Sequence, residues 1–297
     1  MFDPYDDNIT VPDPVVNRVK RVLTSATLFI AAYIPVFLLQ QFITGGLCLI
    51  FGYNPKITYN DIGNLPFEYT SWSFLRVLII FSSGPVICLL IGIFLIDFFN
   101  QLRGKRSLFR FFILWMATCC LNLFLGFILF SPLGIEQYHS GLYVGFSIVG
   151  TWTRMGFIVT SPLALASAAA SMLVGYFLFS NIIKFSFSSR LLQTPSGQRK
   201  IIVQFFIMPV LLAAPLLIAL TTFKSVLLHV ALLFNMLLMG MGLFINVGSI
   251  SRDITVQKND VLNDFPVTWL LLAASIYLSV WFFLRDDDLL IISRKLF

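Results

Sequence analysis

Charged residues are scarce in this sequence. Asp, Glu, Lys and Arg together make up 11% of the 297 residues, whereas 58% are hydrophobic. A soluble domain is typically about half apolar and about a quarter charged. The composition therefore excludes an ordinary soluble globular protein and indicates an integral membrane protein. Several uncharged apolar runs reach the roughly 20 residues that cross a bilayer as a helix, and none alternates like the strands of a membrane β-barrel.

Side chains that bind metals or form disulfides are also scarce, because the chain has two histidines and four cysteines. All four cysteines lie inside apolar runs, at Cys48, Cys88, Cys119 and Cys120. Cysteine in such a setting usually packs as a small hydrophobic side chain, and this spacing matches no zinc motif. We therefore expect no disulfide, no metal site and no cofactor.

We also expect no cleavable signal peptide. The chain opens with Asp3, Asp6 and Asp7, where a signal peptide would be basic, and the first apolar segment is longer than a signal-peptide core. We expect residues 1–21 to form a cytoplasmic tail that leads into an uncleaved first span.

The apolar runs predict an all-α, polytopic integral membrane helix bundle with six or seven transmembrane helices, in a single domain over residues 1–297. The predicted spans cover residues 22–51, 74–99, 111–130, 163–183, 201–220, 226–247 and 267–284. The first would rise about 45 Å as a helix, more than the hydrocarbon thickness. It must therefore tilt, protrude or break, and Pro35 and the pair Gly45-Gly46 are the expected break points. The fourth is rich in Ala, Ser and Gly, which predicts a position at the centre of the bundle.

Two connecting segments are expected on the outer face. Residues 52–71 combine turn residues with Thr, Tyr and Phe, which favours a short hairpin at the membrane surface. Residues 135–160 contain Arg154, whose burial at the centre of a span would cost about 2.5–3.5 kcal/mol. We interpret this segment as interfacial or re-entrant, and the sequence leaves open whether it crosses the membrane.

The net charge of +6 comes from basic residues in short loops. Such a pattern reports topology rather than nucleic-acid binding, and placing the N-terminus in the cytoplasm puts most lysines and arginines on the cytoplasmic side. We predict a bacterial cytoplasmic (inner) membrane protein in contact with the lipid bilayer, with a membrane-protein partner or oligomer and no nucleic acid. Basic residues in the tail 285–297 leave the side of the C-terminus open.

Four short motifs between residues 30 and 135 occur in the order found in a known family. They are Gln40-Gln41-Phe42-Ile43-Thr44 before Phe51-Gly52, the loop 54–66, Ser82-Ser83-Gly84-Pro85, and Asn122 followed by Ser131-Pro132-Leu133-Gly134. Together they resemble the core of site-2-protease-like intramembrane metalloproteases. That family carries His-Glu-x-x-His in its first core helix, a β-rich loop after it, and a Gly-Pro in its second. Its third carries an Asn and an aspartate-containing box.

The zinc-binding motif is degenerate in this chain. Gln40 and Thr44 stand where the family has histidines, and Gln41 stands where it has the catalytic glutamate. No aspartate occurs between Asp97 and Asp253, so the third ligand is missing too. Amides and hydroxyls are poor zinc ligands, and an amide cannot act as a general base. The resemblance implies a non-catalytic relative in which Gln40, Gln41 and Thr44 line a polar cleft with Asn122 opposite.

Other polar residues are candidate sites. Arg76 and Arg154 either extend to the outer interface or bind an anion or lipid headgroup. Glu136 and His139 share a helical face as in di-metal bundles, but the further carboxylates of such a site are missing, which favours a surface patch. His229 is alone in an apolar span, which predicts a hydrogen bond to a neighbouring helix rather than a ligand role.

The leading functional hypothesis is a non-catalytic membrane protein that binds a membrane segment or scaffolds a membrane complex. The alternative is a transporter or permease subunit in which the same amides, Arg154 and a fifth helix bent by Pro209 and Pro215 line a path. An enzyme acting on lipid is the weakest hypothesis, because no acid-base cluster lies within the spans.

Overall fold

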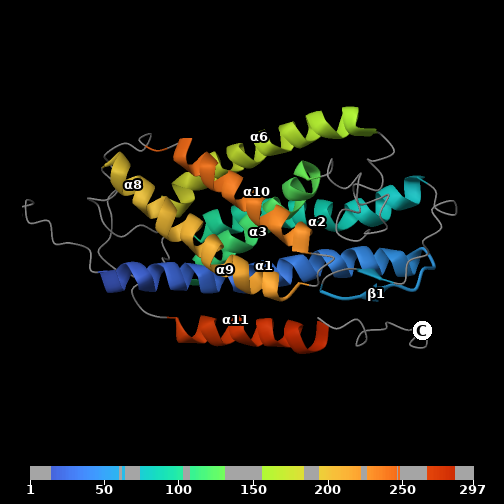
Figure 1. Ribbon diagram of the computed structural model, residues 1–297, viewed down its shortest axis with the longest axis horizontal. Helices are drawn as coiled ribbons and strands as arrows, with labels where there is room; N and C mark the ends of the chain where they lie inside the picture. Colours follow the sequence, from blue (N-terminus) through green and yellow to red (C-terminus); the bar gives the residue numbers. More distant parts are fainter. Residues whose placement is uncertain are drawn as a thin grey trace, which may run out of the picture.

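The computed structural model describes residues 15–59, 62–63, 74–102, 108–130, 156–183, 194–221, 226–245, 247 and 266–284. Seven helices in these ranges are long and apolar enough to cross a membrane, so the chain is a multi-pass membrane protein. They are α1 (Val15–Ile50), α2 (Phe74–Gln101), α3 (Leu108–Leu129), α6 (Gly156–Ile183), the continuous α8 (Pro195–Ile202), η3 (Val203–Ile207) and α9 (Met208–Ala219), α10 (Val226–Ile245), and α11 (Val267–Ser279) extended by η4 (Val280–Leu284). Figure 1 shows them as an elongated bundle.

Helix α1 forms the axis of the bundle and is unbroken. It continues through Pro35 and through Gly45-Gly46, so these are not break points and, of the three expected outcomes, the break does not occur. Its 36 residues correspond to about 54 Å. In Figure 1 its C-terminal part extends well past the ends of α9 and α11. The helix therefore accommodates its excess length without breaking, which leaves protrusion or tilt.

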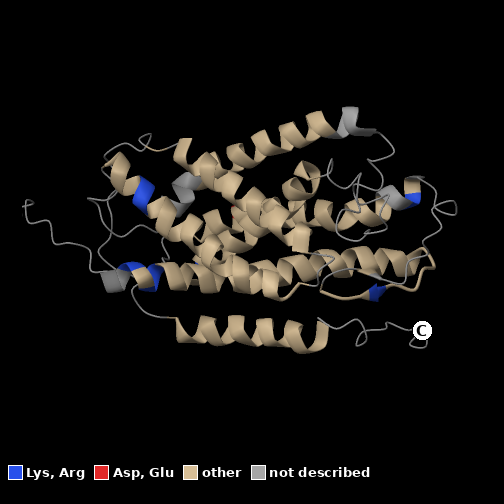
Figure 2. Cartoon of the chain, in the orientation of Figure 1, with Lys and Arg blue, Asp and Glu red and all other residues tan. Residues whose placement is uncertain are grey.

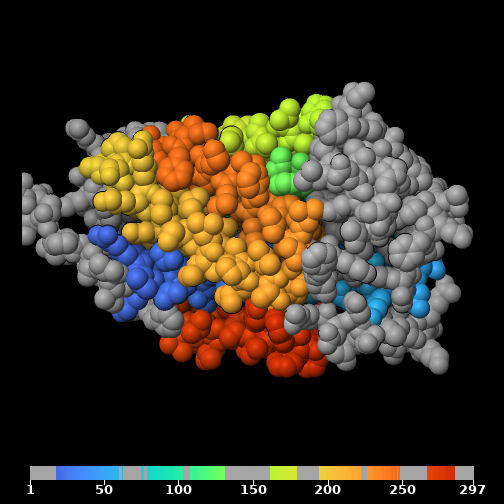
Figure 3. All heavy atoms as spheres, in the orientation of Figure 1, coloured from blue at the N-terminus to red at the C-terminus, as the bar shows by residue number. Residues whose placement is uncertain are grey.

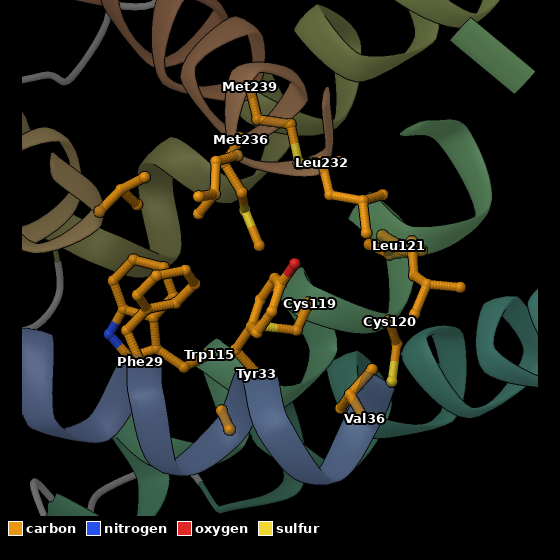
Figure 4. Packing of buried hydrophobic residues seen from close by; sticks show 14 of the residues in the cluster. Phe29, Tyr33, Val36, Trp115, Cys119, Cys120, Leu121, Leu232, Met236 and Met239 are labelled. Atoms are coloured by element: carbon orange, nitrogen blue, oxygen red, sulfur yellow. The ribbon is translucent and has the colours of Figure 1, made fainter. Parts of the chain in front are cut away.

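The centre of the bundle is made by α1, α3 and α10. The most apolar stretches of α1, α3 and α10 are 67%, 72% and 61% buried, against 28% for α2 and α6 and 11% for α11. Phe29 and Tyr33 of α1, Trp115 of α3 and Met236 of α10 pack together there, as Figure 4 shows. Figure 3 shows α11 as an outer layer along one edge.

The predicted central position of α6 is therefore wrong. Its small residues serve contacts with α10 and α3: Ser167 donates to the carbonyl of Leu125 on α3, and two glycines mark a close crossing with α10. A Cβ on Gly175 would collide with the carbonyl oxygen of Met239, and one on Gly242 would collide with that of Met172. Small residues let two membrane helices approach at such a crossing, but they do not require that the other faces be buried.

The predicted hairpin after α1 is confirmed. Gly52, with a φ of 84°, reverses the chain at the end of the helix, where glycine adopts positive φ without steric cost. Strands β1 (Lys56–Ile57) and β2 (Ile62–Gly63) then pair antiparallel, with Lys56 opposite Gly63. The side chain of Ile57 lies against Gly45, so the hairpin folds back along α1.

The segment 135–160 is described only from Gly156 onward. Residues 156–160 belong to α6, so the helix begins earlier than the predicted span, and the predicted interfacial segment extends too far at this end. The remainder, including Glu136, His139 and Arg154, lies outside the described residues.

Candidate polar site along α1

Gln40 and Thr44 lie one helical turn apart on α1 and face Gly84 of α2. A Cβ on Gly84 would lie 2.7 Å from Thr44 Oγ1 and 2.8 Å from the carbonyl oxygen of Gln40. The glycine thus lets the two helices meet at the polar stretch of α1. Gln40, Gln41 and Thr44 are all buried, with exposed fractions of 3%, 3% and 1%.

Two oxygens at this contact have no hydrogen-bond partner, namely Gln40 Oε1 and Thr44 Oγ1. Leaving a buried polar group unsatisfied costs about 1–3 kcal/mol, and such groups in native proteins usually bind something. An amide oxygen accepts hydrogen bonds only, whereas a hydroxyl both donates and accepts. The contact can therefore receive a hydrogen-bond donor.

Asn122 forms a hydrogen bond with Asn235 of α10 rather than with the polar stretch of α1. Its Oδ1 accepts a hydrogen bond of 3.0 Å from Asn235 Nδ2, and Asn235 Oδ1 accepts one of 2.8 Å from Ser171 Oγ. This chain of three buried side chains joins α3, α10 and α6, close to the Gly175–Gly242 crossing. No bond between Asn122 and Gln40 or Thr44 occurs in the described ranges, so the placement of Asn122 opposite those residues gains no support.

A second polar site lies where the hairpin meets α10. His229 is fully buried, and its Nδ1 is 3.0 Å from the hydroxyl of Tyr33, which confirms the predicted hydrogen bond to a neighbouring helix. The ring of Tyr59 stacks on His229 at 5.3 Å, and Phe37 packs against both. The Tyr59 backbone N–H donates to the carbonyl of Leu284 at 3.1 Å, so the hairpin joins α1, α10 and η4.

This second site also contains unsatisfied atoms. His229 Nε2 and the Tyr59 hydroxyl are buried without a hydrogen-bond partner. Burial, and then the nearby Tyr277, raises the pKa of Tyr59 above its usual value, so this residue remains a neutral hydroxyl at physiological pH. The sequence offered no reason to single out Tyr59, because its role depends on how the hairpin folds back.

Apart from Lys56 on β1, the charged residues that the structure describes lie away from both sites. Lysines and arginines at the start of α1 and in α8 gather at one end of the bundle (Figure 2). Arg76 lies exposed in the first turn of α2. Arg154 lies outside the described residues, so the anion or lipid headgroup site at these two arginines stays a prediction. Asp97 is the only acidic residue in the described ranges.

The described residues contain no group of three His, Cys, Asp or Glu side chains placed to hold a metal ion. Neutral amides, hydroxyls and an imidazole can bind, orient and exchange hydrogen bonds with a neutral guest. Comparison with known proteins gives no match to any family model, curated protein or solved structure.

Proposed function

We propose that this chain is a non-catalytic membrane protein whose core resembles site-2-protease-like metalloproteases and binds a membrane segment or scaffolds a membrane complex. The observation that carries the proposal is the pair of unsatisfied oxygens, Gln40 Oε1 and Thr44 Oγ1, held against Gly84. A polypeptide segment in the bilayer can supply the donor that these oxygens lack, whereas lipid acyl chains cannot.

The arrangement of the motifs supports the resemblance. The stretch that replaces the zinc-binding motif and the Ser82-Ser83-Gly84-Pro85 stretch lie side by side on α1 and α2. A hairpin follows α1. The side chains at the metal and base positions are an amide, an amide and a hydroxyl, which supports binding rather than metal-assisted hydrolysis.

Photo-crosslinking tests the binding role. A benzophenone amino acid at Ile87, near the Gly84 face of α2, should capture one discrete membrane protein, and the double variant Gln40→Leu/Thr44→Val should abolish that product. Ile93 is the matched control, since it is exposed on the opposite face of the same helix. Equal capture from both positions, or capture that survives the double variant, would refute the proposed site.

Elemental mass spectrometry tests the non-catalytic role. The purified protein and a Gln40→Ala/Thr44→Ala variant should both lack stoichiometric zinc. Zinc at one ion per chain that disappears in the variant would overturn the proposal in favour of an active metalloprotein.

The alternative is a transporter or permease subunit. Its support is the π-helical turn η3 followed by Pro209 in the fifth span, because irregular helices in membranes often line polar paths. Solute flux in proteoliposomes that depends on Gln40 would favour this alternative.

A further inference from the structure

Unsatisfied buried polar atoms are concentrated along one part of α1. Gln40 Oε1, Thr44 Oγ1, Tyr59 OH and His229 Nε2 all lack a partner. All four lie beside the stretch of α1 between Tyr33 and Thr44. Buried hydroxyls elsewhere are mixed: Ser25, Ser167 and Ser171 donate to defined acceptors, whereas Thr24 Oγ1 and Ser161 Oγ have no partner. Four of the seven such atoms in the described ranges nevertheless lie at this one stretch.

The four atoms form two neighbouring pairs. The rings of His229 and Tyr59 are stacked. The centroid of the Phe37 ring lies 4.5 Å from that of His229 and 5.3 Å from that of Tyr59. Gln40 and Thr44 follow Phe37 by about one and two helical turns on α1. The hairpin covers this stretch at both ends, because Tyr59 packs on Phe37 and Ile57 packs on Gly45.

The chemistry of the four atoms defines what they can bind. Gln40 Oε1 needs a donor, the two hydroxyls can donate or accept, and the role of His229 Nε2 depends on which ring nitrogen carries the proton. Apart from Lys56 on β1, the described residues of this stretch, of α2 around Gly84, of α10 and of η4 carry no charge. Water both donates and accepts, so it can satisfy each of the four atoms, and a buried water typically makes two to four such bonds.

We propose that α1 between Tyr33 and Thr44, covered by the hairpin, forms a hydrated internal site for small neutral hydrogen-bonding molecules, with water as the resident ligand. The site includes the Gln40–Thr44 face of the proposed function but does not require a protein partner. The experiments below use purified protein alone, so their outcome is separate from that of the crosslinking test.

Thiol reactivity compares two threonines of equal burial. Thr44 and Thr118 are 1% and 2% exposed, but Thr118 Oγ1 donates to the carbonyl of Leu114. In a cysteine-free background, Thr44→Cys should react with a small neutral methanethiosulfonate roughly tenfold faster than Thr118→Cys, because the reactive thiolate forms in water and is suppressed in an apolar core.

X-ray hydroxyl-radical footprinting needs no substitution. Radicals formed from bound water should oxidise Tyr59, which has no exposed surface, more strongly than Trp115, which is 2% exposed in a dry core. Equal reactivity of the two cysteine variants in folded protein would show that water does not reach Gln40 and Thr44. Less modification of Tyr59 than of Trp115 would show that no water is bound beside Tyr59 and His229. Either result overturns the proposal.

Discussion

At the residue scale, Ser25 shows how one hydroxyl serves two neighbours. Its Oγ donates to the carbonyl of Phe205 at 2.7 Å and accepts from Trp115 Nε1 at 3.2 Å. Residue 209 is a proline, which has no N–H to offer the Phe205 carbonyl four residues earlier. The serine of α1 therefore satisfies a carbonyl that the fifth span leaves open.

We predict that Ser25→Ala destabilises the bundle by about 1–2 kcal/mol, because the carbonyl and the indole both lose a partner. The measurement is unfolding in mixed micelles with increasing SDS. In a Pro209→Ala background the same substitution should cost less, since an N–H is restored near the carbonyl. Equal costs in the two backgrounds would show that the proline is unrelated to the role of Ser25.

A second prediction concerns Asn235, the middle member of the chain with Asn122 and Ser171. Asn235→Leu should lower the free energy of unfolding by about 1–3 kcal/mol, since hydrogen bonds within membrane proteins are each worth about 0.6–1.7 kcal/mol and the two remaining side chains lose their partner. Unfolding of the variant in SDS is compared with that of Phe234→Leu, an exposed neighbour. Similar losses of unfolding free energy in both variants would contradict a stabilising role for the hydrogen bonds that link Asn122, Asn235 and Ser171.

At this scale the sequence indicates which polar residues form hydrogen bonds, but not which residues they bond. The isolation of His229 in an apolar span correctly predicted a hydrogen bond to another helix. Its partner, Tyr33, is 196 residues away, and nothing in a local pattern selects that residue. Asn122 was expected opposite Gln40, yet it bonds Asn235. Which face of α3 meets α10 depends on the packing of the whole bundle, so it could not be read from the sequence.

At the element scale, the spans were predictable because apolar length determines them. The seven predicted ranges agree closely with the helices, and turn residues predicted the hairpin. Two expectations about helix behaviour were wrong. Pro35 does not break α1, because neighbouring packing can satisfy the carbonyl that a proline leaves open. Helix α6 is peripheral because only one of its faces, which meets α3 and α10, is buried.

The crossing of α6 and α10 gives a third prediction. Gly175→Ala should destabilise the protein by about 1–3 kcal/mol, because the new methyl group meets the backbone of α10 and overpacking cannot relax around a carbonyl. Gly46→Ala is the matched control, since a Cβ there meets nothing within 4 Å. It should be neutral or stabilise α1 by up to about 1 kcal/mol. Thermal unfolding in detergent compares the two, and a tolerated Gly175→Ala would contradict the close contact.

At the scale of the whole molecule, helix length and charge are distributed unevenly along the bundle. Helix α8 and the start of α1 carry basic residues at one end (Figure 2), whereas the hairpin and the polar stretch of α1 lie toward the other (Figure 1). Excess Lys and Arg normally mark the cytoplasmic side. The proposed sites therefore lie toward the side opposite the N-terminus of α1.

The number of crossings depends on α11, which is the weakest span. With η4 it covers 18 residues and is 11% buried, and about 27 Å of helix barely matches the hydrocarbon core. It is nonetheless held by Trp269 against Phe112 and by the Tyr277 hydroxyl, which donates to the carbonyl of Leu216.

We predict that α11 crosses the membrane, so that the two termini lie on opposite sides. A fluorescent protein fused after residue 247 should fluoresce in the cytoplasm, and alkaline phosphatase fused at the C-terminus should be active outside it. Fluorescence from a fusion at the C-terminus would mean that α11 lies along the bundle without crossing.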